Sequence, residues 1–139
     1  MTKLVITKAQ RKLIEREAEV DFPRECCGLL IGHGEQTVVV ADVVPTQNQA
    51  DSEDRFLIDP QVQFDWIRKL RGSDLQLIGH YHSHPNGRRG PSAHDAAMAM
   101  DAGQIWLIAS MDDSRVGEIQ AFVNGPDTGV LLPISIQIK

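Results

Sequence analysis

The chain has 139 residues, 42% hydrophobic and 24% charged, which is typical of one globular domain over residues 1–139 and excludes a disordered chain. No apolar run approaches the ~18 residues of a membrane span, and the apolar N-terminal stretch is too short for a signal peptide, so we expect a cytoplasmic protein. The net charge is −5 and the lysines and arginines are scattered, so the sequence shows no basic patch of the kind that binds nucleic acid.

The first third of the chain indicates short apolar strands around one amphipathic helix. Thr7 and Gln10 form a capping-box pattern at the start of this helix, which must end near Pro23. Apolar runs bounded by turn residues predict three strands, at Leu4–Ile6, Cys27–Gly32 and Gln36–Val44, the last two as a hairpin.

The remainder alternates strands and helices after a polar loop at Gln47–Asp54. Asp59 and Pro60 are typical of a helix start, and this helix runs to about Arg71. Ser92 opens an alanine-rich helix that we expect to close at Gly103. Four more strands are predicted, at Leu75–His82, Ile105–Met111, Glu118–Val123 and Val130–Ile138. Strands and helices in mixed order predict an α/β (α+β) fold with one sheet flanked by about three helices.

The two cysteines, Cys26 and Cys27, are adjacent, and neighbouring cysteines rarely meet the geometry of a disulfide. We expect both thiols to be reduced. No CxxC spacing is present, so we expect at least one of them to pack as a small buried hydrophobe.

The stretch from Gly79 to Asp95 contains four of the five histidines. Residues two apart in a strand point to the same face, so His82 and His84 present neighbouring imidazoles. Zinc binds imidazole nitrogen, and a catalytic zinc takes three protein ligands with one open position. Asp95, brought back by a loop onto the first turn of the next helix, is the third candidate.

His80 lies on the same face of the predicted strand as His82 and His84, because the three are two residues apart. A strand rises ~3.3 Å per residue, which separates His80 from His84 by about 13 Å at the backbone. The three cannot converge on one ion, so only one adjacent pair binds. We choose His82 and His84 because the break at Pro85 frees that end of the strand for a site.

The pattern of Ser92 followed by Asp95 has a second interpretation, because Ser-x-x-Asp also caps helices. Taken alone, it favours capping over metal binding. The two roles are compatible, since a capped helix start is a rigid mount for a ligand. The combination with the two histidines favours metal binding.

The pattern His82-x-His84-x7-Ser92-x2-Asp95, preceded by Glu25 in Pro-x-Glu-x-Cys-Gly, resembles the JAMM (MPN-domain, JAB-type) zinc metalloprotease family. The resemblance covers essentially the whole chain, in a compact prokaryotic form. It implies a curved mixed sheet with flanking helices, similar to the cytidine-deaminase fold. It also implies one zinc per chain on the two histidines and Asp95, with Glu25 acting through the zinc-bound water and Ser92 stabilising the oxyanion.

The chemistry of these residues leads to amide hydrolysis. Zinc lowers the pKa of its water and polarises a carbonyl, and a nearby carboxylate can take the proton and deliver it to the leaving amine. Glu25 is the best candidate because it directly precedes a buried strand. The alternative is that Glu25 is an ordinary exposed acid with no catalytic role.

Other functions remain open at this point. One is a non-catalytic MPN scaffold, although every ligand position is intact here. Others are a RadC-like protein, which shares the HxHP…PSxxD spacing, and a phage-tail or cell-wall peptidase. A zinc deaminase and a thermolysin-like protease are excluded, because His-x-Glu with PCxxC and HExxH are missing.

The chain lacks the long insertions with which eukaryotic members grip ubiquitin. Compact members resemble enzymes that act at the Gly-Gly tail of ubiquitin-like or sulfur-carrier proteins, which makes such a protein the expected partner. The loop after the histidines carries Arg88 and Arg89. Either they bind a carboxylate of the substrate, for which a planar guanidinium is suited, or they form a solvated turn.

Overall fold

The computed structural model describes residues 3–99, 101–126 and 129–139. Three helices are present in these ranges: α1 (Lys8–Asp21), α2 (Pro60–Leu70) and α3 (Ala93–Met98). The strands are β1 (Lys3–Ile6), β2 (Cys27–His33), β3 (Thr37–Thr46), β4 (Gln76–His84), β5 (Ile105–Asp112), β6 (Arg115–Asn124) and β7 (Leu131–Ile138). None of the described helices is long and apolar enough to cross a membrane.

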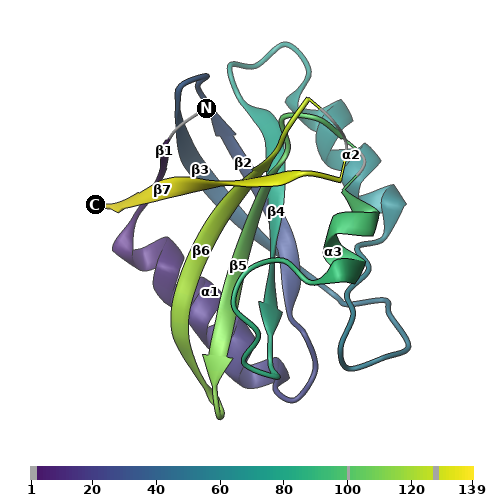
Figure 1. Cartoon of the computed structure of the whole chain (residues 1–139). Coiled ribbons are helices and arrows are strands. Elements are labelled where there is room, and N and C mark those ends of the chain that lie inside the picture. Colours follow the sequence, from purple (N-terminus) through teal and green to yellow (C-terminus); the bar gives the residue numbers. More distant parts are fainter. Residues whose placement is uncertain (1–2, 100, 127–128) are drawn as a thin grey trace.

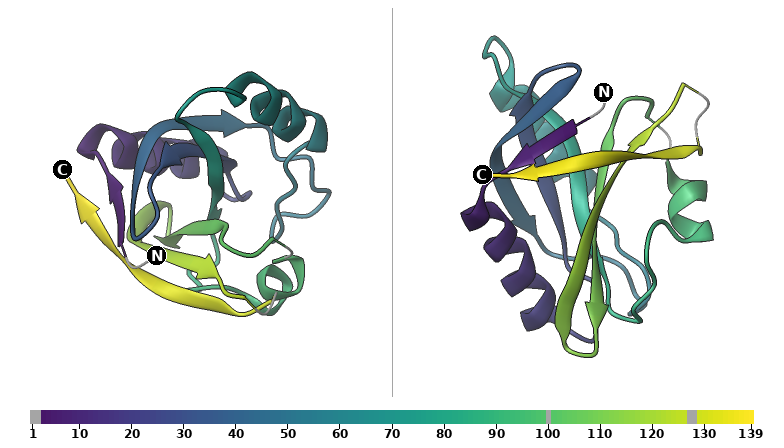
Figure 2. Two further views of the ribbon diagram at one scale, coloured as in Figure 1. Left: turned by 90° about the horizontal axis from the view of Figure 1, so that it is seen from above. Right: turned by 60° about the vertical axis from the view of Figure 1, so that its left-hand side comes forward.

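The strands form one mixed sheet that closes into a barrel in the order β1-β3-β2-β4-β5-β6-β7. The expected mixed sheet and the three helices are confirmed in the described residues, but the sheet closes into a barrel, whereas only a curved sheet was expected. The closure is due to β1, which pairs in parallel with both β3 and β7 and so has no free edge. Its Leu4, Val5 and Ile6 are buried. The view from above the barrel shows the strands surrounding a common centre (Figure 2).

The main core lies between the strands and α1. Ile14 and Ala18 of α1 are fully buried, in one cluster with Leu30, Tyr81 and Leu107 from three different strands. The capping box predicted at the start of α1 is present. Helices α2 and α3 lie on the side of the barrel away from α1, at the right of Figure 1.

Two predicted boundaries are wrong in ways that matter for the site. Strand β4 continues past His82 to His84, because the parallel strand β5 pairs with it as far as Ser110. Helix α3 ends at Met98 instead of Gly103. The backbone N–H of Gly103 donates to the carbonyl of Asn124 on β6, so Gly103 lies in a turn bound to the sheet. The alanine-rich sequence before it does not extend the helix this far.

Candidate metal centre

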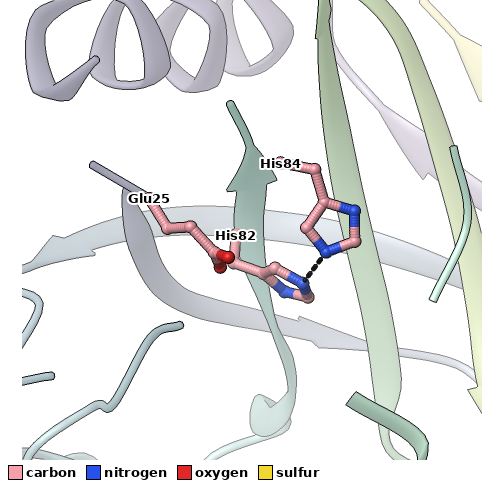
Figure 3. Close-up of side chains that lie close together, drawn as sticks. All are labelled: Glu25, His82 and His84. Carbon is pink, nitrogen blue, oxygen red and sulfur yellow. Dashed lines mark hydrogen bonds between the residues drawn. The ribbon is translucent and has the colours of Figure 1, made fainter. Parts of the chain in front are cut away.

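Strand β4 presents His82 and His84 on one face, as their spacing predicts. Both side chains are buried, with relative exposures of 0% and 4%. Their Nε2 atoms lie 3.1 Å apart, and the rings turn toward one another (Figure 3). Two imidazole nitrogens therefore meet at one point beside the barrel wall.

Asp95 joins this pair from the first turn of α3. Its Oδ2 lies 3.3 Å from the Nε2 of His82 and 3.0 Å from the Nε2 of His84. The same oxygen accepts the backbone N–H of Ser92, and the Ser92 hydroxyl accepts the backbone N–H of Asp95. The capping interpretation of the Ser-x-x-Asp pattern is confirmed, and Asp95 also lies beside both histidines, as a metal ligand at this position would have to.

Glu25, far away in sequence, lies beside the two histidines. It immediately precedes Cys26 and β2, and ligand atoms of Glu25, His82 and His84 all lie within 4.8 Å of one another (Figure 3). The pairing of β2 with β4 brings these segments together. Ser83 strengthens the junction, because its hydroxyl accepts the backbone N–H of Cys26 at 2.8 Å and its own N–H bonds to the carbonyl of Cys26.

Gly28 leaves room between β2 and β4 for the buried ring of Tyr81. A Cβ atom at this position would lie 2.3 Å from that ring, and Tyr81 is the partner of Gly28 in the strand register. Any larger residue would have to displace the ring of Tyr81. The Cys-Gly part of the motif around Glu25 thus has a direct packing function.

Sequence reasoning missed Asn48, which ties the long loop after β3 to Glu25. Its Nδ2 donates to the carbonyls of Glu25 and Arg55, both at 2.9 Å. Its Oδ1 accepts the backbone N–H groups of Ala50 and Leu57. An asparagine in a polar loop carries no local signal of these contacts.

The loop held by Asn48 also covers the histidines. The ring of Phe56 stacks on His82 with a centroid separation of 4.3 Å. This contact shields one face of the imidazole from water and fixes its plane.

A second loop orients His84 from the other side. The Nδ1 of His84 lies 3.1 Å from the carbonyl oxygen of Arg88, and the hydroxyl of Ser110 donates to that same oxygen at 2.8 Å. Because a carbonyl only accepts, Nδ1 donates its N–H to this oxygen, and in the neutral imidazole the lone pair is then on Nε2. Gly87 and Gly90 have φ values of 81° and 74°, which let the loop return to the strand.

The two arginines of this loop differ in their surroundings. Arg89 pairs with Glu118 of β6 at 2.6 Å, and both side chains are well exposed. Arg88 is exposed and contributes its backbone carbonyl to His84. A carboxylate from outside would therefore compete with Glu118 for Arg89.

Burial and neighbouring charges set the protonation states. Burial, with smaller contributions from Asp95 and Asp54, raises the pKa of Glu25 to about 8. Burial alone would raise the pKa of Asp95, but its close side-chain contacts with His82 and His84 outweigh burial and hold that pKa well below its usual range. Burial lowers the pKa of His82, which keeps the imidazole in the neutral form that binds metals.

His80 has a different environment from the other two histidines of β4. Its ring packs edge-on against Trp106 at 4.3 Å, and its centroid lies 6.0 Å from that of His82. Burial lowers the pKa of His80 to about 3. Ligand atoms of Glu25, His82 and His84 lie within 4.8 Å of one another and Asp95 contacts both of these histidines, whereas His80 is not part of this group among the described residues.

The donor set fits a small divalent cation. Ligand atoms ~2.0–2.1 Å from a tetrahedral zinc stand about 3.3 Å apart. The Nε2 atoms of His82 and His84 and the Oδ2 of Asp95 are separated by 3.0 to 3.3 Å. The Oε1 of Glu25 is buried and has no hydrogen-bond partner among the described residues, so it is available to a ligand at this point.

Cys26 and Cys27 are both buried, which confirms the expectation that at least one of them packs as a small buried hydrophobe. Burial raises the pKa of Cys26 to about 12 and that of Cys27 to about 11. Neither belongs to the cluster of metal-ligating side chains in the part of the chain that the structure describes.

Solved structures share this architecture. A solution structure of protein DSY2949 from Desulfitobacterium hafniense superposes with a TM-score of 0.84 at 28% identity, covering 98% of this chain and 92% of that chain. A solution structure of a protein from Salinibacter ruber gives a TM-score of 0.70 at 21% identity, covering 97% and 90%, and supports the fold alone.

Sequence comparison extends these similarities. A curated relative, "Desampylase" of Haloferax volcanii, is 30% identical over 92 residues, which are 66% of this chain and 66% of that protein's length. Residues 7–124 match the family described as prokaryotic homologs of the JAB domain. With this match and the barrel described above, the chain belongs to the family of prokaryotic JAB-domain proteins.

Proposed function

We propose that the protein is a zinc-dependent metallopeptidase or isopeptidase that hydrolyses an amide bond at the C-terminal tail of a ubiquitin-like or sulfur-carrier protein. The observation that carries this proposal is the meeting of three donor atoms, 3.0 to 3.3 Å apart, beside the buried carboxyl of Glu25. The similarity to a protein named Desampylase supports the choice of substrate class.

His82, His84 and Asp95 are the proposed ligands of one zinc ion per chain. A bound zinc supplies a Lewis acid for the carbonyl and lowers the pKa of water. The protein contributes two neutral imidazoles and one carboxylate, and the carbonyl of Arg88 fixes the tautomer of His84. In the other neutral tautomer of His84 the N–H would be on Nε2, and this nitrogen would have no lone pair to bind the metal.

Glu25 is the proposed general base and acid. Its Oε1 faces no partner among the described residues, so it can accept a proton from the attacking water. The same oxygen then delivers this proton to the leaving nitrogen. A cation held by His82, His84 and Asp95 would favour the ionised form of Glu25 and so oppose the effect of burial on its pKa.

Ser92 is the proposed donor to the carbonyl oxygen. Its Oγ accepts the backbone N–H of Asp95, which fixes the position of the oxygen while the hydroxyl hydrogen can still be donated. A donor aimed at the developing negative charge contributes typically a few kcal/mol. Arg88 and Arg89 are proposed to bind an acidic group of the substrate, with Arg89 exchanging Glu118 for it.

The buried carboxyl of Glu25 favours an enzyme over a non-catalytic scaffold. Burying a polar atom without a partner costs ~1–3 kcal/mol, and a scaffold gains nothing from that cost. A catalytic group needs the free lone pair.

The test is hydrolysis of a carrier protein fused through its tail to a peptide, with zinc and after treatment with a chelator. Glu25→Gln keeps the shape of the side chain and removes the proton acceptor, so it should bind zinc and lose most of the activity. Full activity of Glu25→Gln or of the chelated wild type would overturn the proposal.

A further inference from the structure

A pocket lies next to the candidate metal centre, toward the start of β4. We call it the His80 pocket, and its volume is about 230 Å³. Leu77, Gly79 and His80 of β4 line it, and so does Phe56, whose ring stacks on His82. An apolar cavity of ~150 Å³ is large enough for a benzene ring, so this pocket has room for one substituted ring.

The inner wall of the pocket is apolar and partly aromatic. Leu29, Ile58 and Trp106 line this wall and are buried. The ring of Trp106 lies edge-on to that of Phe56, with a centroid separation of 6.1 Å. Edge-to-face and offset contacts stabilise aromatic pairs beyond the burial of their area, so a planar ring gains more from these walls than an aliphatic group of equal size.

His80 adds one polar group to this wall. Its Nε2 is buried and has no hydrogen-bond partner among the described residues. Buried polar atoms are normally paired, so this nitrogen points to a ligand that supplies the missing partner. In a neutral imidazole Nε2 either donates or accepts, depending on the tautomer, and a hydroxyl group can meet both cases.

The charges at the pocket favour a neutral ligand. No lysine or arginine is among the described lining residues, so an anion would find no permanent positive charge. The acid Asp101 lines the pocket but is exposed, and an ion pair formed there is screened by water. Moving a charged group against the apolar inner wall is unfavourable unless the charge is paired.

We propose that the His80 pocket binds a neutral phenol group, an aromatic ring that carries one hydroxyl. The ring packs against Phe56 and Trp106, and the hydroxyl pairs with the imidazole of His80. Such a ligand also covers Leu57 and Met98, which line the pocket and are 46% and 52% exposed. Its binding requires neither the proposed zinc nor amide hydrolysis. The phenol group belongs either to a free small molecule or to a tyrosine side chain of a polypeptide.

Four small molecules, titrated into ¹⁵N-labelled protein and followed by NMR, test this assignment. p-Cresol is the phenol, toluene lacks the hydroxyl, methylcyclohexanol lacks the aromatic ring, and p-toluate carries a negative charge. The chain has two tryptophans, and Trp66 is outside the described pocket lining. p-Cresol should shift the indole N–H signal of Trp106 saturably, and by far more than that of Trp66.

The dissociation constants of the four molecules have an expected order. Toluene and methylcyclohexanol should each bind about threefold to tenfold more weakly than p-cresol, the range of one net hydrogen bond or one aromatic pair. p-Toluate should cause no saturable shift of the Trp106 signal at the same concentrations. Equal affinity of p-cresol and toluene, or no saturable shift with p-cresol, would overturn the inference.

Two variants of His80 test the proposed hydrogen bond. His80→Phe keeps a ring against Trp106 and removes both nitrogens, so it should bind p-cresol and toluene equally well. His80→Leu has the smaller side chain and should give the same result if the ring of His80→Phe fills the pocket. The matched control is His33→Phe at the end of β2, an exposed histidine outside the described lining, which should keep the preference for p-cresol. A preference for p-cresol that survives in either His80 variant would overturn the inference.

Two capped amino acids distinguish the two sources of the phenol group. If the pocket takes a tyrosine side chain, Nα-acetyl-tyrosine amide should bind more tightly than Nα-acetyl-phenylalanine amide by the same factor as p-cresol over toluene. If neither shifts the Trp106 signal while p-cresol does, the ligand is a free small molecule. Binding of the phenylalanine amide as tightly as the tyrosine amide would overturn the choice of a phenol.

Discussion

The Nδ1 of His84 lies 3.1 Å from the carbonyl oxygen of Arg88, so the loop after β4 determines which imidazole nitrogen of His84 faces Asp95. Ser110 of β5 donates to the same carbonyl and holds it in place. The orientation of one proposed ligand therefore depends on a neighbouring strand that contributes no ligand itself.

Ser110→Ala should weaken zinc binding without preventing it. Mutating a partner that orients a ligand typically costs 10–100-fold in affinity, and Ser110 acts one step further away, so about threefold to tenfold is expected. Competition with a fluorescent zinc chelator measures this. Ser114→Ala, an exposed serine in the next turn, is the control. An unchanged affinity of Ser110→Ala would show that the carbonyl needs no support.

Asn48→Ala should lower kcat more than it changes KM, with zinc content unchanged. The variant leaves two carbonyls and two N–H groups without their partner, including the carbonyl of Glu25. The free energy of unfolding should fall by ~1–3 kcal/mol. Steady-state kinetics and urea unfolding are the measurements, with the exposed Gln49→Ala as control. If Asn48→Ala folds and has the wild-type kcat, Asn48 does not position Glu25.

The residues within one local stretch were predictable from the sequence. The two-residue period of a strand placed His82 and His84 together, and the capping box placed Ser92 and Asp95 at a helix start. These relationships depend on local geometry, which the sequence carries directly. Glu25 was identified by its motif, because its contact with β4 is long-range.

Contacts between distant segments could not be predicted in the same way. Asn48, Ser110 and the pair of Arg89 with Glu118 depend on how loops fold back on the barrel. The closure of the sheet depends on β1 pairing at both edges, whereas its sequence indicates only a short apolar strand. Periodicity gives the faces of an element but not its partners.

Native Cys26 and Cys27 should react slowly with thiol reagents. Thiolate is the reactive form, and the pKa values of about 12 and about 11 leave only about one thiolate in a thousand, or fewer, at pH 8. Raising the pH toward these values increases the thiolate fraction. Titration with Ellman's reagent should find both thiols only after unfolding in guanidinium chloride. A rapidly reacting thiol in the folded protein would contradict the burial of both.

Arg88→Ala/Arg89→Ala should raise KM for the carrier substrate by about tenfold, equivalent to ~1.4 kcal/mol, and leave zinc content unchanged. The wild-type KM should also rise with salt, because exposed charge pairs are screened. Kinetics at low and high ionic strength provide the measurement. Glu118→Gln separates the two roles of Arg89, since it frees this arginine and should lower KM. An unchanged KM in the double variant would make the loop a solvated turn.

The zinc content of Asp95→Ala is the most direct test of the proposed metal centre. Wild type and the control His94→Ala, which changes the neighbouring histidine on α3, should each bind about one zinc per chain. Asp95→Ala and Asp95→Asn, shown to be folded by circular dichroism, should bind far less in elemental analysis of dialysed protein. A folded Asp95→Ala with one full equivalent of zinc would contradict the assignment of His82, His84 and Asp95 as the ligands.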